Sequence, residues 1–199
     1  CLMFHCTHTH TGPATMVLFG CGIGQEKFLD FLQEQFLTII QQALTGKTFV
    51  EQGRFFEIDW PEGFAFNRIG LPDKDTYVRG LELTLEQGRP ILLVSYACHP
   101  VTLGRGDHYS ADYPGALVQE FNAYGTRAVF INGPCGDIDP ISNAVAWGSG
   151  TTRTLQIYAR DLATVIRQGL NNAKPVVLDK IKACSRLIPL NADIPDAAA

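Results

Sequence analysis

Long apolar runs, basic clusters and closely spaced cysteines are absent from this sequence. No apolar run within its 199 residues approaches the roughly 18–20 residues that a membrane-spanning helix needs. The formal net charge is −4 and no stretch gathers lysine and arginine, which argues against a nucleic-acid-binding surface. The six cysteines show no CxxC spacing and no dense disulfide pattern. We interpret them as small buried hydrophobic residues, with a soft-metal ligand among Cys6, Cys98 and Cys135 left open.

The composition is that of a folded α/β domain. Apolar residues make up 46% of the chain and charged residues 18%, which is enough for one sizeable core and too apolar for a disordered chain. Apolar positions at three- and four-residue steps predict a long helix over 25–45, which we interpret as scaffold. Further elements are predicted as follows: strands over 2–4, 48–58, 80–85, 90–97, 127–131 and 176–182 and near Leu187, and helices over 112–124 and 151–171.

The order of these elements predicts a mixed sheet. The runs 80–85 and 90–97 flank Gln87-Gly88-Arg89 and are typical of a hairpin. The run 90–97 is almost entirely apolar, as expected for a central strand, and the sequence strand, helix, strand over 90–131 favours a parallel right-handed crossover. We therefore expect an α/β fold with a mixed, largely parallel β-sheet flanked by α-helices.

The pattern His8-Thr9-His10 is the first candidate for a functional site. It follows the apolar run 2–4, and Gly12-Pro13 then turns the chain. If the run is a strand, side chains alternate faces along it, so the two imidazoles share one side about 7 Å apart. Imidazole nitrogens bind zinc at about 2.0–2.1 Å, so such a pair can converge on one ion or one reacting centre.

Two further polar loops follow predicted strands. His99 comes directly after the strand 90–97 and before Pro100, which cannot continue a ladder. Asp137 and Asp139 lie in a glycine- and proline-rich loop after the strand 127–131. Ligand sites in open α/β sheets lie at the carboxyl ends of strands, so we expect the three loops to converge. Histidine and carboxylate are natural zinc ligands in hydrolases, and the pattern favours a metal-dependent hydrolase.

These residues belong to a longer series of motifs that resembles a known family. From its start to about residue 141 the chain resembles the catalytic domain of the neutral/alkaline (non-lysosomal) ceramidases and their bacterial relatives. The motifs, in order, are His8-Thr9-His10-Thr11-Gly12-Pro13, Asn67-Arg68, Cys98-His99-Pro100, Ser110-Ala111-Asp112 and Gly136-Asp137-Ile138-Asp139-Pro140.

The resemblance implies a site and a reaction. It implies that His8 and His99 bind Zn²⁺, and that His10 lies beside the ion and assists the tetrahedral intermediate. It also implies that Arg68 contacts the substrate. The family reaction is hydrolysis of the amide of N-acylsphingosine to sphingosine and a fatty acid, so the expected partner is a small-molecule or lipid amide. A downstream Glu and Tyr complete the family's zinc shell.

The chain departs from the family pattern in two places. The family's Gly-Asp-x-Ser-Pro has a catalytic serine where this chain has Asp139. A carboxylate cannot replace that hydroxyl, so we expect Asp139 to act as a general base or to bind a metal, which would suit a different substrate. The downstream Glu and Tyr have no counterpart before Ala199. We therefore interpret residues 1–199 as part of one ceramidase-like catalytic domain, truncated at both ends.

Three functions stay open on the sequence alone. The first is a zinc-dependent amidohydrolase of ceramidase type, and the second is a hydrolase of the same scaffold with another amide substrate. The third is a non-catalytic binding module derived from such an enzyme. The compartment and the oligomeric state stay open as well, because a true ceramidase would be extracellular or periplasmic whereas the cysteine usage also fits the cytoplasm.

Overall fold

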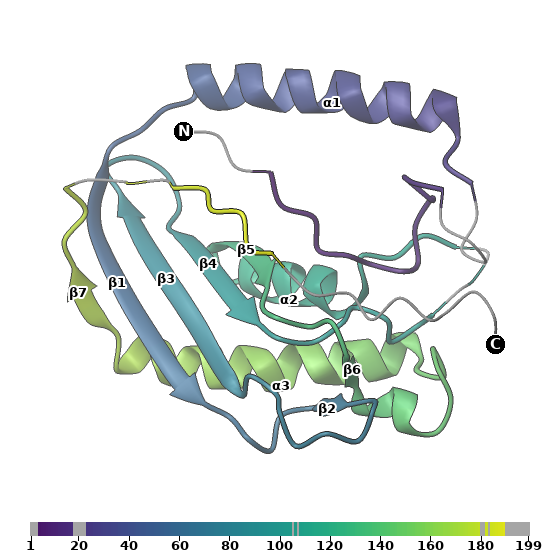
Figure 1. Cartoon of the computed structure of the whole chain (residues 1–199). Helices are drawn as coiled ribbons and strands as arrows, with labels where there is room; N and C mark the ends of the chain where they lie inside the picture. Colours follow the sequence, from purple (N-terminus) through teal and green to yellow (C-terminus); the bar gives the residue numbers. More distant parts are fainter. Residues whose placement is uncertain are drawn as a thin grey trace.

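A five-stranded mixed sheet forms the centre of the molecule (Figure 1). The computed structural model describes residues 4–17, 23–104, 106, 108–179, 182 and 184–189. The strand order in the sheet is β5-β4-β3-β1-β7. The bounds are β1 (Val50–Asp59), β3 (Tyr77–Leu85), β4 (Ile91–Tyr96), β5 (Arg127–Asn132) and β7 (Lys174–Val176). The α/β class expected from the sequence is confirmed.

The sequence predicts a mixed, largely parallel sheet, and the directions of the strands differ from that prediction. The predicted hairpin is confirmed, since β3 and β4 pair antiparallel, and β4 pairs with β5 in parallel as the crossover requires. The β1–β3 and β1–β7 pairs are antiparallel, so the sheet is mixed but not largely parallel. The reason is that only the β4–α2–β5 crossover joins two neighbouring strands of this sheet, and the other neighbouring pairs run in opposite directions.

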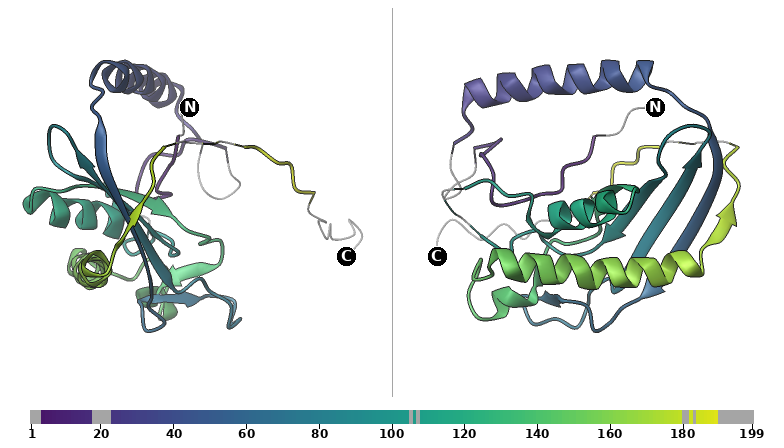
Figure 2. Two further views of the ribbon diagram at one scale, coloured as in Figure 1. Left: turned by 90° about the vertical axis from the view of Figure 1, so that its left-hand side faces the viewer. Right: turned by 180° about the vertical axis from the view of Figure 1, so that it is seen from behind.

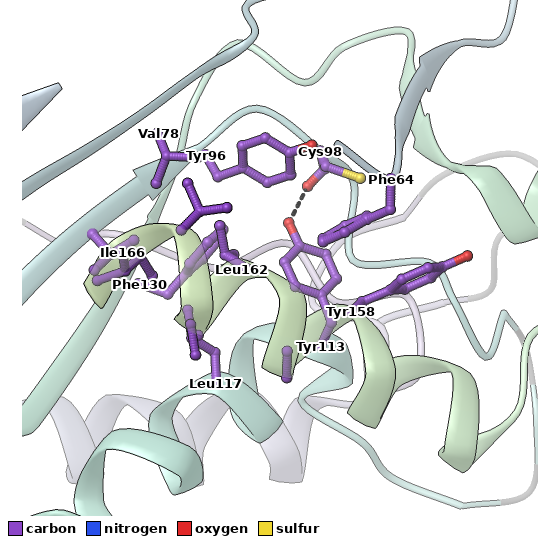
Figure 3. Packing of buried hydrophobic residues seen from close by; sticks show 14 of the residues in the cluster. Phe64, Val78, Tyr96, Cys98, Tyr113, Leu117, Phe130, Tyr158, Leu162 and Ile166 are labelled. Carbon is purple, nitrogen blue, oxygen red and sulfur yellow. Dashed lines mark hydrogen bonds between the residues drawn. The ribbon is translucent and has the colours of Figure 1, made fainter. Parts of the chain in front are cut away.

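One face of the sheet carries the core. Helices α2 (Asp112–Ala123) and α3 (Thr152–Asn171) cover this face, as the side view in Figure 2 shows. Along β4, buried Leu92, Val94 and Tyr96 alternate with half-buried residues, which is the period of a strand with one face fully covered. All three belong to the core cluster, and Figure 3 shows Tyr96 in that cluster with side chains of both helices, among them Leu117 and Leu162.

Helix α1 (Glu26–Thr45) forms where the apolar periodicity predicts it but contributes nothing to this core. None of its residues is buried, and it lies apart from α2 and α3 in Figures 1 and 2. Its described aromatic contacts include the Phe4 and Phe36 rings, whose centroids are 5.2 Å apart. Periodicity predicts that a helix has an apolar face, but it does not identify what that face packs against.

Two matched leucine substitutions measure this difference between the helices. Leu162 in α3 is completely buried, so Leu162→Ala is expected to lower the free energy of unfolding by about 2–5 kcal/mol. Leu37 in α1 is 55% exposed, and Leu37→Ala is expected to change it by less than about 0.5 kcal/mol. Urea denaturation of both variants makes the comparison. Equal losses would show that α1 packs as tightly as α3 in solution.

Several predicted elements need correction. Residues 4–17 contain no strand, so the expected strand at 2–4 does not extend into the described residues, and residues 1–3 lie outside them. The last sheet strand is Lys174–Val176 rather than 176–182, and 184–189 contains no strand near Leu187. A second small sheet that the sequence does not predict pairs β2 (Ala65–Asn67) with β6 (Ile138–Pro140). Among the described residues, no helix has both the length and the hydropathy that crossing a bilayer demands.

Candidate metal centre

Isolated hydrogen bonds to the loop after β4 and to the end of β5, not a strand ladder, hold the segment that carries His8 and His10. Thr9 Oγ1 donates to the carbonyl oxygen of Ser110 at 2.7 Å, and Thr11 Oγ1 donates to that of Gly104 at 2.6 Å. From the end of β5, Asn132 Nδ2 donates to the carbonyl oxygen of Thr7 at 2.7 Å. The threonines between and after the histidines therefore fix the segment against the loop between β4 and α2.

The three histidines expected at the site lie together. Ring centroids are 4.9 Å apart for His8 and His10, 5.0 Å for His8 and His99, and 5.6 Å for His10 and His99. One potential ligand atom from each imidazole lies within 4.8 Å of the other two. His8 has φ 64°, a left-handed backbone conformation that costs free energy in a residue other than glycine and that often marks a functional site.

His99 is positioned by the core of the domain. It follows β4 as predicted, and its backbone N–H donates to the carbonyl oxygen of Ile138 in β6 at 2.8 Å. The preceding residue, Cys98, is fixed by helix α2, because Tyr113 Oη donates to the carbonyl oxygen of Cys98 at 2.7 Å (Figure 3). The His99 side chain is 8% exposed. A rigid strand end thus presents this imidazole to the two histidines of the N-terminal segment.

Burial and the neighbouring imidazoles favour the neutral forms of His10 and His99. Partial burial, together with the neighbouring His8 and His99, lowers the pKa of His10 to about 4. Burial also lowers the pKa of His99, and His8 adds to the effect. A metal binds the neutral form of imidazole, so both rings are in the binding form at neutral pH. Imidazole nitrogens bind zinc at about 2.0–2.1 Å, and a cluster of this size and chemistry fits one such ion.

Asp139 lies beside this cluster and Asp137 does not. Asp139 in β6 has a side chain only 3% exposed, and its Oδ1 is 3.7 Å from His99 Nδ1. Arg68 Nη1 lies 3.4 Å from the same oxygen, so the residue expected to contact substrate reaches the site. Asp137 instead accepts a hydrogen bond from Asn67 Nδ2 at 3.0 Å, which ties its loop to β2.

Two residues at the site carry no signal in the sequence. The ring of Trp147 lies 5.9 Å from that of His10 in an edge-to-face arrangement, and this side chain is 44% exposed. Asn143, in the short 3₁₀ helix Ile141–Ala144, donates from Nδ2 to Asp139 Oδ2 at 3.1 Å. Both residues belong to an irregular stretch between β6 and α3, where neither periodicity nor a motif indicates proximity to the histidines.

Asp112 joins the loop that follows β4 to the first turn of α2. Its carboxylate accepts hydrogen bonds from the backbone N–H groups of Leu103 at 3.1 Å and Tyr113 at 2.8 Å, and the residue is 2% exposed. Asp112 is the first residue of α2, with Ala111 at the N-cap and with φ 55° at Asp112. Aspartate adopts this backbone conformation more readily than most residues.

Removing the Asp112 carboxylate is expected to destabilise the whole site region. Asp112→Ala leaves two N–H groups without their acceptor, one of them buried, at a cost of about 1–3 kcal/mol in the free energy of unfolding. Asp112→Asn keeps an acceptor oxygen and is expected to lose less. Urea denaturation of the two variants gives the comparison, and wild-type stability in Asp112→Ala would contradict this role.

Comparisons with known proteins give one structural neighbour. No protein-family model matches the chain, and no curated protein matches it in sequence. Among solved structures, neutral ceramidase from Pseudomonas aeruginosa matches with a TM-score of 0.57 and 15% sequence identity. The match covers 75% of this chain and 26% of that chain, so this chain corresponds to about a quarter of the length of its neighbour. The likeness shows a ceramidase-like fold.

Proposed function

We propose that this chain is part of a zinc-dependent hydrolase that cleaves a linear N-acyl amide. The observation that carries the proposal is the convergence of His8, His10 and His99 from two distant segments onto one point at the end of β4. The ceramidase-like fold supports it, because the neighbour that shares the fold is a ceramidase. We propose that His8 and His99 hold the ion and that His10 acts on the substrate.

We assign separate roles to the metal and to the residues around it. A bound zinc supplies positive charge that polarises a carbonyl group and activates water near neutral pH. His10, an exposed residue with a lowered pKa, has an imidazole N–H that can donate to the oxygen on which negative charge develops. Arg68, whose side chain is 44% exposed, can reach a polar group of the substrate. The exposed ring of Trp147 forms an apolar wall beside His10.

Asp139 favours a second candidate, a hydrolase of the same scaffold that acts on an amide other than ceramide. By resemblance it stands where ceramidases have a catalytic serine, and a carboxylate offers no hydroxyl there. Exchanging protons with the reaction as a general acid or base is the catalytic role that the sequence assigns to it. The simplest such substrate keeps the N-acyl amide that zinc would act on, and carries a group other than sphingosine on the amide nitrogen.

The proposal extends to the protein as a whole. We propose that residues 1–199 are part of one catalytic domain, because the matched structure is about four times as long as the matched region. By resemblance, a Glu and a Tyr from a later part of the protein complete the zinc shell. The full-length protein is therefore the one to assay.

Metal analysis combined with an amide-hydrolysis assay tests the function. The full-length protein is expected to purify with about one zinc ion and to release fatty acid from a panel of N-acyl amides that includes ceramide. Removing zinc with a chelator should abolish turnover, and adding zinc back should restore it. Turnover of other N-acyl amides without ceramide would select the second candidate. Protein that takes up no stoichiometric zinc would be a binding module and would contradict both.

A further inference from the structure

We propose that Asp139 is a positioning residue that fixes the ring of His99 through Nδ1 and so leaves Nε2 as the nitrogen available to the metal. The inference rests on the proposed metal site. It differs from the proton-transfer role that the sequence favours for Asp139, and it concerns a residue that differs from the one ceramidases have at this position.

The first support is the state of His99 Nδ1. This nitrogen is buried and has no hydrogen-bond partner among the described residues. Asp139 Oδ1, at 3.7 Å, is the negatively charged group beside it. A buried ring nitrogen without a partner is costly, and a small rotation of the His99 ring would bring this pair to hydrogen-bond distance. Histidines that bind metals almost always donate their other ring N–H to a carboxylate, a carbonyl oxygen or water.

The second support is the rigid setting of the carboxylate. Asp139 Oδ2 accepts a hydrogen bond from Asn143 Nδ2 at 3.1 Å, and Arg68 Nη1 lies 3.4 Å from Oδ1. Arg68 is itself fixed by a hydrogen bond from Nη2 to the carbonyl oxygen of Gly136 at 3.1 Å. The backbone of Asp139 pairs with Phe66 in the small sheet. A carboxylate held on both oxygens can orient a neighbouring ring, because it has little freedom of its own.

The third support is that the site gives Asp139 little opportunity for direct catalysis. Its side chain is 3% exposed, so it is almost closed to substrate from solution. Its oxygens do not join the set of ligand atoms that lie within 4.8 Å of one another, which consists of His8, His10 and His99. The Asp139 carboxylate therefore lies beside His99 but is not exposed where a substrate would bind.

Two measurements on the full-length protein test this role. The first is zinc affinity, from competition with a chromophoric chelator. Asp139→Ala is expected to weaken binding about 10–100-fold, the usual cost of losing such an outer partner of a ligand. Asp139→Asn keeps an acceptor oxygen for the ring N–H and is expected to lose less. Asp137→Ala is the matched control, since Asp137 lies in the same loop but bonds Asn67, and it should bind zinc as the wild type does.

The second measurement is the tautomer of His99 in the metal-free protein, read from its ring ¹⁵N shifts. Wild type is expected to carry the proton on Nδ1, and Asp139→Ala should shift it toward Nε2. This readout needs no zinc, so it decides the role of Asp139 even if the protein binds none. An Nε2 proton in the wild type, or an unchanged tautomer in a folded Asp139→Ala variant, would overturn the proposal. Unchanged zinc affinity in that variant would overturn it as well.

Discussion

Replacing His8 or His99 by alanine is expected to strip the full-length protein of its zinc. The two side chains come from distant parts of the chain, and their rings lie 5.0 Å apart. Loss of an outer partner of a ligand costs about 10–100-fold in metal affinity, and loss of a ligand itself should cost more. Each variant should therefore purify with little zinc and hydrolyse amides at a small fraction of the wild-type rate. Elemental analysis and turnover on the same preparation give the result.

His5→Ala is the matched control for this experiment. His5 belongs to the same N-terminal segment, but its Nε2 accepts a hydrogen bond from the backbone N–H of Asn132 at 3.0 Å and it is not part of the metal cluster. The control should keep its zinc. Full zinc retention in both His8→Ala and His99→Ala would contradict the metal site, and equal loss in the control would show that the segment as a whole had been displaced.

Replacing His10 by alanine is expected to separate metal binding from turnover. If His10 donates to the developing oxyanion, as the resemblance implies, its loss should lower kcat about 10²–10³-fold. Zinc should stay bound, because His8 and His99 remain. The ring of His10 is well placed for this role, since it is more exposed than His99 and lies beside the exposed ring of Trp147.

His10→Gln sharpens the comparison. Its amide N–H₂ can still donate a hydrogen bond, so it should recover part of the kcat that His10→Ala loses. Zinc loss in both variants would give the opposite assignment, in which His10 is a third ligand. The structure is compatible with that assignment, because a nitrogen of His10 lies within 4.8 Å of a ring nitrogen of His8 and of His99.

Periodicity and turn residues predict most of the elements and the pairing of strands close in sequence, but not the pairing of distant ones. The helix over 25–45, the hairpin and the parallel β4–β5 pair follow from patterns local to each segment. The antiparallel β1–β7 pair does not, because it joins residues far apart along the chain. The exposure of α1 is also not predicted from the sequence. An apolar stripe indicates that a helix has a packing face, but it does not identify the residues that cover that face.

In the candidate site, too, the sequence predicts some of the contacts and not others. The rule that strand ends carry ligand sites brings His99 and Asp139 together correctly. The convergence of His8 and His10 is also found, but not through the alternation of a strand. It arises from a left-handed turn at His8 and from threonine hydrogen bonds to one loop about 90–100 residues later. Such tertiary contacts have no local pattern, and the same holds for Trp147 beside His10.

Anomalous diffraction at the zinc edge, from crystals of the full-length protein, tests the metal site most directly. The account predicts one strong anomalous peak between His8 and His99, with an imidazole nitrogen of each at about 2.0–2.1 Å from it. A zinc-containing protein with no peak at these histidines, or with its peak at another group of residues, would contradict the account.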